Sequence, residues 1–299
     1  MAKAAPAHLP PLPTVEEIPF KSESAYLCLI VNRRLGFIRV IDFRAGALPA
    51  KRLFIQNVAK REGIEKVILL VEKDEVSSWT RVGFVREGTV PGFYKRSDGH
   101  LVGCVIGDRT ASIEVGEDGI RLAERTLNNA KKFGKDIPEM PSNVSVSEAD
   151  DTDVLKVRDE VWKKGAGISG FDAFGREAER FFLEVTPRRG KPNYLSAEHQ
   201  DCFGHALVEV LRHPENDAEV LAIVGGLKVM SDRLKDGGLI SAFAFAPSDD
   251  NALATAYVAA GFRKTGLLAA GWHAHNGHGR RDAILWTKKL ANPAGDEPE

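Results

Sequence analysis

The densest group of chemically versatile side chains is the segment GWHAHNGHGRRD at 271–282, which contains three histidines. His273 and His275 alternate with an alanine, so an extended backbone places both imidazoles on one face, and His278 follows across a turn. Imidazoles grouped in this way can ligate a divalent metal. The Asn-Gly step at 276–277 also fits the solvated tip of a β-hairpin, which needs no ligand. We favour the hairpin and expect no metal.

Composition narrows the class of protein. The 41 basic and 42 acidic side chains nearly cancel, whereas a nucleic-acid surface normally needs a basic excess, so we expect no nucleic-acid partner. No apolar run approaches the roughly 18 residues of a membrane span, so we expect no membrane segment. The N-terminal stretch lacks the apolar core of a secretory signal, and the three cysteines have neither metal nor disulfide spacing. These features favour a cytoplasmic protein.

The elements that must position such side chains follow one order twice. In the first half we expect a strand hairpin at 25–43, a helix at 48–64, a buried strand at 66–73, a short helix at 74–84 and a strand pair at 87–107. In the second half we expect a hairpin at 204–225 turned by HPEND, a helix at 226–238, a strand at 239–247, a helix at 248–262 and a strand pair at 263–290.

Two nearly identical motifs mark the same place in both halves, GFVREG at 83–88 and GFRKTG at 261–266. Together with the matching order of elements, they predict two tandem α/β domains with mixed sheets, the first a partial copy. The expected boundaries are a flexible arm at 1–20, a first domain at 21–112, a helix and linker at 113–142, a second domain at 143–290 and a flexible tail at 291–299.

A Gly-Phe step that closes the last helix before a final strand pair resembles the GNAT acyltransferase fold. Within that superfamily the chain looks most like the β-lysine N6-acetyltransferases, through GFVREGTVPGFYKRSDGHLVG at 83–103, GFRKTGLL at 261–268 and RRDAILWTKKL at 280–290. The likeness covers about two thirds of the chain. It implies two GNAT-like domains in tandem and acetyl-CoA as co-substrate.

The resemblance also implies roles for particular residues. Tyr257 lies four residues before Gly261, where many GNAT enzymes place a tyrosine that protonates the departing CoA thiolate. The alternative for Tyr257 is an ordinary core residue. The corresponding residue of the first half is Trp79, which cannot serve as that acid. Glu209 and Glu219, expected on the strands that flank HPEND, are candidate proton acceptors or plain outward-facing carboxylates.

Binding of CoA pyrophosphate in this superfamily uses backbone N–H groups of a glycine-containing loop between a strand and a helix. The corresponding junction is expected at Val224, Gly225, Gly226 and Leu227, although this loop is short and lacks the usual arginine. The loop is therefore an incomplete phosphate site.

The C-terminal hairpin borders the acyl-acceptor site in GNAT folds. The resemblance therefore implies that substrate is contacted by residues of this hairpin, namely Trp272, His273, His275 and Asp282. The polar stretch at 187–205 is either a lid over the substrate or an insertion without a role.

Two functions remain open. The first is an N-acetyltransferase that moves an acetyl group from acetyl-CoA to a small amine, β-lysine-like or another amino compound, by direct attack without a covalent enzyme intermediate. The second is a degenerate, non-catalytic GNAT-like protein that acts as a binding or regulatory module with a protein partner. The resemblance favours the first function and the incomplete phosphate loop favours the second.

Overall fold

A computed structural model describes residues 12–23, 25–44, 46–107, 113–138, 140–200, 203–273 and 279–291. The first half contains β1 (Val15–Lys21), β2 (Tyr26–Asn32), β3 (Phe37–Arg44), α1 (Leu48–Glu62), β4 (Lys66–Val71), α2 (Val76–Arg81), β5 (Val85–Val90) and β6 (Gly99–Val105), and α3 (Glu117–Gly134) follows. The second half contains β7 (Val144–Ala149), α4 (Asp151–Lys163), β8 (Glu179–Pro187), β9 (Asn193–His199), β10 (His205–Val210), α5 (Asp217–Asp236), β11 (Ser241–Pro247), α6 (Asn251–Ala259), β12 (Arg263–His273) and β13 (Arg280–Lys289).

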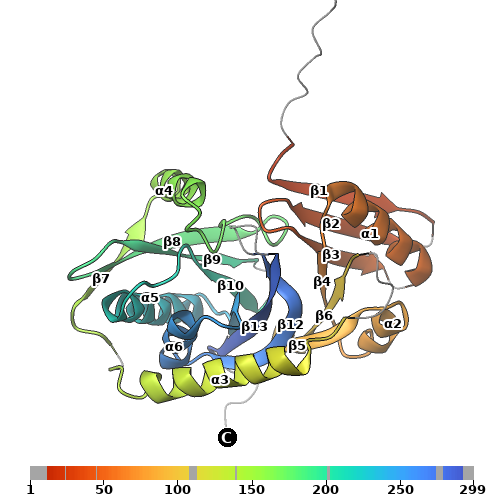
Figure 1. Cartoon of the computed structure of the whole chain (residues 1–299). Coiled ribbons are helices and arrows are strands. Elements are labelled where there is room, and N and C mark those ends of the chain that lie inside the picture. The colour runs from red at the N-terminus through yellow and green to blue at the C-terminus, as the bar shows by residue number, and fades with distance from the viewer. Residues whose placement is uncertain are drawn as a thin grey trace, which may run out of the picture.

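One mixed sheet of 13 strands runs through both halves, in the order β1-β2-β3-β4-β6-β5-β12-β13-β11-β10-β9-β8-β7. The sequence prediction of a mixed α/β fold is confirmed. Figure 1 shows the two halves side by side, joined where β5 meets β12. In the described part of the chain, no helix is both long and apolar enough to cross a membrane.

The two half-sheets have the same strand order. The first reads β1-β2-β3-β4-β6-β5, and the second reads β8-β9-β10-β11-β13-β12 with β7 added at its edge. Each contains one parallel pair, β3 with β4 and β10 with β11, because a helix connects those strands. The counterpart of the first half therefore begins at β8, earlier in the chain than the hairpin at 204–225 with which the predicted order of the second half begins.

The Gly-Phe motifs form the same helix ending in both halves. Each glycine lies in the left-handed region, with φ of 89° at Gly83 and 88° at Gly261. The N–H of the next residue, phenylalanine, donates to the carbonyl of Trp79 at 3.2 Å in the first half and of Tyr257 at 2.9 Å in the second. The repeated Gly-Phe motif thus specifies a tight turn from helix into strand.

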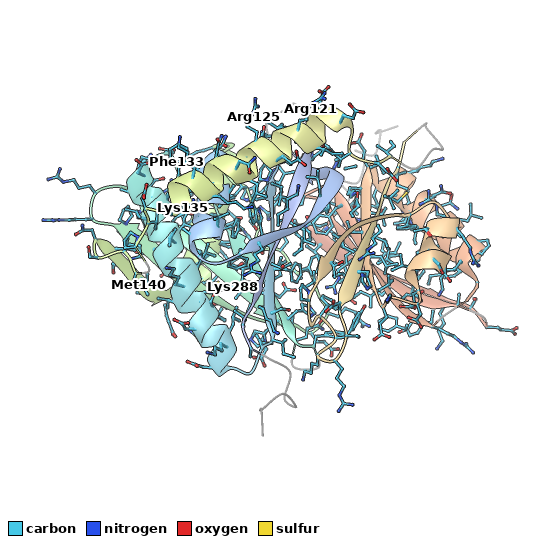
Figure 2. The ribbon with its side chains drawn as sticks, turned by 90° about the horizontal axis from the view of Figure 1, so that it is seen from below. Arg121, Arg125, Phe133, Lys135, Met140 and Lys288 are labelled. Atoms are coloured by element: carbon cyan, nitrogen blue, oxygen red, sulfur yellow. The ribbon has the colours of Figure 1, made fainter. Side chains whose placement is uncertain are left out.

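The helix α3 packs alongside α6 and leaves its opposite face in solvent. Its buried residues are small, Ala123, Thr126 and Ala130, which allows a close approach between the two helices. Figure 2 shows Arg121 and Arg125 projecting from α3 away from the body of the molecule. This amphipathic pattern is what the sequence predicts for a surface helix.

Two sequence predictions about irregular segments were wrong. The predicted arm at 1–20 includes β1, which pairs along its whole length with β2. An edge strand tolerates Pro19 because one row of its backbone groups needs no partner. The predicted polar stretch at 187–205 contains β9, a strand inside the sheet between β8 and β10. The predicted C-terminal tail lies, after residue 291, outside the described residues.

Candidate functional site

The parallel strands β10 and β11 separate part of the way along their length. Their ladder pairs join His205 to Ser241 and Leu207 to Phe243, and no later pair follows among the residues described. Beyond that point Glu209 on β10 and Phe245 on β11 face a cavity of about 60 Å³. A gap between parallel strands at their carboxyl ends is a common place for a ligand in α/β proteins.

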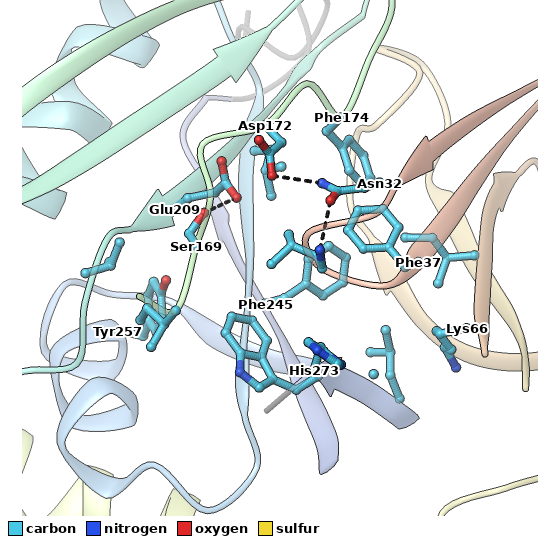
Figure 3. Close-up of a pocket in the computed structure, with 18 residues that line it drawn as sticks. Asn32, Phe37, Lys66, Ser169, Asp172, Phe174, Glu209, Phe245, Tyr257 and His273 are labelled. Atoms are coloured by element: carbon cyan, nitrogen blue, oxygen red, sulfur yellow. Dashed lines mark hydrogen bonds between the residues drawn. The ribbon is translucent and has the colours of Figure 1, made fainter. Parts of the chain in front are cut away.

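Both halves of the molecule line this cavity. The first half supplies Asn32, Leu35, Phe37, Lys66 and Ile68, and the second supplies Ile168, Ser169, Asp172, Phe174, Leu207, Glu209, Val210, Phe245, Tyr257, Leu268, Gly271, Trp272 and His273. Figure 3 shows Glu209, Ser169 and Tyr257 on one side of the cavity, with Phe37 and Lys66 on the other.

Glu209 is held at the cavity by two hydroxyl groups. The Oγ of Ser169 donates a hydrogen bond to Oε1, and the Oγ of Ser196, directly opposite on β9, donates to Oε2 at 3.2 Å. Burial raises the pKa of Glu209 to about 7, against a smaller lowering by the charge of Arg180. A carboxylate with a pKa near neutrality can take a proton and release it again at physiological pH.

Tyr257 projects from α6 to the same cavity. Its side chain is 1% exposed, and its ring stacks on Trp286 with 5.7 Å between the ring centroids. Burial raises the pKa of its phenol, and the neighbouring charge of Glu209 adds to that effect. The hydroxyl therefore stays protonated at neutral pH and is a proton donor. The structure brings together Tyr257 and Glu209, two of the three predicted catalytic residues.

A loop between α4 and β8 lines the cavity and contacts the first half. The carboxylate of Asp172 in this loop accepts a hydrogen bond from Asn32 at 3.2 Å and lies 3.1 Å from Nε of Arg34. The guanidinium of Arg39 donates to the carbonyl oxygen of Phe174 at 2.6 Å. These contacts tie the loop to the hairpin of β2 and β3, so the first half forms one wall of the cavity.

A buried ion pair sets the shape of the opposite wall. Nζ of Lys66 lies 2.6 and 2.8 Å from the carboxylate oxygens of Glu87 and donates to the carbonyl of Ala269 at 2.8 Å. The N–H of Ala269 donates to the same carboxylate at 3.0 Å. Both residues of the pair belong to the first half, while Ala269 lies in the irregular part of β12 between Leu268 and Trp272. The pair therefore fixes the bulged strand that carries Gly271 and Trp272.

The prediction of a pyrophosphate-binding loop was wrong, because its residues belong to a helix. Val224, Gly225, Gly226 and Leu227 lie buried in the middle of α5, where the backbone N–H groups are used within the helix. A Cβ atom on Gly226 would collide with Val185 of β8. These glycines allow α5 to pack closely on the sheet and present no phosphate cradle.

The junction between strand and helix lies instead at residues 211–216, so HPEND is not a hairpin turn. Glu219, predicted on a strand, sits in the first turn of α5, which Asn216 caps. Its carboxylate accepts a hydrogen bond from the N–H of Glu215 at 2.9 Å and from Arg212 at 3.3 Å. Glu219 is 3% exposed and does not line the cavity. The chain's own carboxylate thus occupies the anion-attracting end of α5.

The structure places only some of the predicted substrate contacts at the cavity. Trp272 and His273 line the cavity. Asp282 lies outside the cavity lining, and its Oδ1 accepts a hydrogen bond from the N–H of Ala270 at 3.0 Å. That bond holds the bulge in β12, where Ala270 has a φ of 49°. His275 lies outside the described residues, as does His278, so the metal alternative stays open.

Sequence reasoning missed Ser169, Ser196, Lys66 and Arg212. The serines and the lysine reach the site from segments far apart in the chain, and no local pattern identifies them. Arg212 was detectable, because Asn216 followed three residues later by Glu219 is the signature of a helix start. That signature places the start of the helix at Asn216, so the residues just before it, Arg212 among them, belong to the junction between strand and helix.

No protein-family model matches the chain, and no curated protein is significantly similar to it. Several solved structures of N-acetyltransferases resemble half of it. The ribosomal-protein-S18-alanine N-acetyltransferase from Escherichia coli is 16% identical, with a TM-score of 0.39, over 52% of this chain and 99% of that one. The yncA acetyltransferase from Salmonella typhimurium, solved with acetyl-CoA, is 15% identical, with a TM-score of 0.39, over 53% and 100%.

A mutant of spermidine N-acetyltransferase SpeG from Vibrio cholerae is 11% identical, with a TM-score of 0.37, over 52% of this chain and 98% of that one. Identities and TM-scores this low neither assign the chain to a family nor give it an activity.

Proposed function

We propose that the chain is an N-acyltransferase that moves an acetyl group from acetyl-CoA to a small amine in the cavity between β10 and β11. Glu209 takes the proton that the amine loses as its nitrogen attacks the carbonyl carbon of the thioester. Tyr257 gives a proton to the sulfur as the carbon–sulfur bond breaks. The phenol of Tyr257 recovers its proton from solvent, and Glu209 releases its proton afterwards, so both return to their starting states.

The single observation that supports this proposal most is the placement of Glu209. It is a carboxylate at the point where two parallel strands separate, its pKa is raised to about 7 by burial, and a buried phenol lines the same cavity. A proton acceptor and a proton donor with these properties suit direct acyl transfer to nitrogen. The predicted likeness to GNAT enzymes agrees with this placement.

The same proposal includes the organisation of the chain. We interpret the two halves, with their equal strand order, as tandem GNAT-like copies, of which the second supplies the chemistry and the first a wall of the cavity. We also place the protein in the reducing cytoplasm, where cysteines such as Cys28 and Cys104 remain thiols. The partners in this proposal are acetyl-CoA and a small amine.

One observation favours the alternative, a degenerate module without catalysis. The α5 N-terminus would ordinarily attract the pyrophosphate of CoA, but there the carboxylate of Glu219 already accepts hydrogen bonds from Arg212 and from the N–H of Glu215. A pyrophosphate would meet a buried negative charge at this end of the helix. Under this alternative the protein binds its partner through the cavity or the exposed helices.

Titration calorimetry with acetyl-CoA separates the two functions. The acyltransferase should give a saturable heat with acetyl-CoA and release CoA thiol when an amine is added. Tyr257→Phe should retain the binding and lose turnover by roughly 10²- to 10⁴-fold, as for a lost general acid. Absence of any heat at millimolar acetyl-CoA would contradict the enzyme and support the module.

A further inference from the structure

The charged side chains that line the cavity differ in whether a side chain of opposite charge pairs with them. Lys66 is paired with Glu87, and Asp172 is paired with Arg34. Glu209 instead receives hydrogen bonds from the hydroxyls of Ser169 and Ser196. Among the described residues that line the cavity, Glu209 is therefore the carboxylate that forms no ion pair with a cationic side chain.

The cation that lowers the pKa of Glu209, Arg180, is engaged elsewhere. The guanidinium of Arg180 donates to the carbonyl oxygens of Phe171 and Asp172 and forms an ion pair with Glu198. It acts on Glu209 through its charge, without a hydrogen bond. An ionised Glu209 would consequently face the cavity with its negative charge only partly neutralised, which is costly unless a ligand supplies the positive charge.

Most of the rest of the cavity wall is apolar and rich in aromatic rings. Phe37, Phe174, Phe245 and Trp272 line it, together with the aliphatic side chains Leu35, Ile68, Ile168, Leu207, Val210 and Leu268. Aromatic faces attract a cation and also bury an alkyl chain. The cavity of about 60 Å³ is smaller than the roughly 150 Å³ that holds a benzene ring, so the alkyl group that lies inside it has few carbon atoms.

We propose that the cavity binds a short alkylammonium ion, a primary amine of about two to four carbon atoms, with its nitrogen on Glu209 and its alkyl group among the aromatic rings. The assignment rests on the proposed function in so far as this amine is the acyl acceptor. A polyamine or a diamine of the lysine type fits poorly, because the other carboxylate of the cavity wall, Asp172, is already paired with Arg34, which leaves a second ammonium group without an unpaired charge to meet.

Binding of this ion should depend on pH in a defined direction. Glu209 faces Ser169, Ser196 and Tyr257, and the charges that act on it are those of Arg180, Glu198 and Asp172. Because the carboxylate must be ionised to pair with the ammonium, affinity should rise with pH through about 7. Between pH 6 and pH 8 the expected gain is about tenfold for one titrating group.

The test is calorimetry of the full chain with n-propylammonium chloride, without acetyl-CoA, at pH 6 and pH 8. We expect saturable binding at pH 8, about tenfold weaker binding at pH 6, and little binding of 1-propanol or spermidine. Glu209→Gln should weaken binding of the amine at least tenfold at pH 8. The control Glu160→Gln, an exposed carboxylate outside the cavity, should leave it unchanged.

A second variant tests the position of the alkyl group. Phe245→Ala enlarges the cavity and should shift the preference from n-propylammonium toward n-hexylammonium. Equal binding of amine and alcohol, or an amine affinity that Glu209→Gln leaves intact, would overturn the assignment. Binding of the amine without acetyl transfer would contradict only the proposed enzyme. Acetyl transfer that depends on Glu209 but favours spermidine over n-propylamine would contradict the assignment and leave the proposed enzyme standing.

Discussion

Gly88 of β5 and Gly266 of β12 face each other as paired residues where the two half-sheets meet. A Cβ atom at position 266 would lie 2.5 Å from the carbonyl oxygen of Glu87 and 2.7 Å from the Cα atom of Gly88. Both are backbone atoms, so β5 and β12 would have to separate to make room. The junction of the half-sheets therefore depends on the absence of side chains at these two positions.

Replacing Gly266 by alanine should destabilise the protein by about 2–3 kcal/mol, because the strands that join the halves would be forced apart. Urea unfolding of Gly266→Ala against wild type measures this loss. Gly107→Ala is the matched control, since an added Cβ there would meet no atom within 4 Å. Equal stability of the two variants would show that the junction is not closely packed.

The buried pair of Lys66 and Glu87 should behave as a unit. Glu87→Leu leaves the ammonium of Lys66 buried without its partner and should cost about 3–5 kcal/mol of unfolding free energy. Adding Lys66→Met should recover much of that loss, because no charge then remains buried. If the double variant loses as much unfolding free energy as the two single variants lose together, the residues act independently.

Glu209 should make stability depend on pH. Burial raises its pKa from 4.5 to about 7, so between these values the folded protein holds a proton that the unfolded chain has released. The resulting stabilisation is complete below about pH 4.5 and is lost as pH rises through about 7. It amounts to about 2 kcal/mol, allowing for partial access of solvent. Urea unfolding from pH 4 to 8 should show this slope in wild type and not in Glu209→Gln; equal slopes would contradict it.

Glu219 should oppose binding of anions at the start of α5. Glu219→Gln removes its charge and leaves the guanidinium of Arg212 beside the helix N-terminus, so the affinity for acetyl-CoA should rise by about tenfold, or 1.4 kcal/mol. Titration calorimetry with acetyl-CoA and with pyrophosphate measures the change. Asp217→Asn is the control, because that carboxylate is exposed and screened by solvent. A fall in affinity for Glu219→Gln would show that Glu219 helps to hold the donor.

The sequence was sufficient to predict those elements whose structure depends on residues close together in the chain. The Gly-Phe motifs specify a left-handed residue followed by a strand, and the structure has this turn at Gly83 and Gly261. Likewise the apolar run at 66–71 forms the buried strand β4. Such features depend on neighbours within a few residues and leave a readable pattern.

The wrong predictions arose where a local sequence pattern is compatible with both a strand and a helix. The run EVLAIVGG is apolar and β-branched, which favours a strand, but the cap at Asn216 and the packing of α5 on β8 and β9 make it a helix. With the junction misplaced, Glu219 and the glycines were assigned to the wrong kind of structure. Ser169 and Lys66 reach Glu209 and β12 through contacts between distant segments, which a single sequence does not reveal.

The most direct measurement is acetyl transfer itself, followed by release of CoA thiol and by mass spectrometry of the amine, with acetyl-CoA and n-propylamine at several pH values. Wild type should give N-acetylpropylamine and thiol in equal amounts, at a rate that rises with pH through about 7. Glu209→Gln should lower this rate by roughly 10²- to 10⁴-fold, with Glu160→Gln unchanged. Absence of product from wild type, or an equal rate for Glu209→Gln, would contradict the proposed active site.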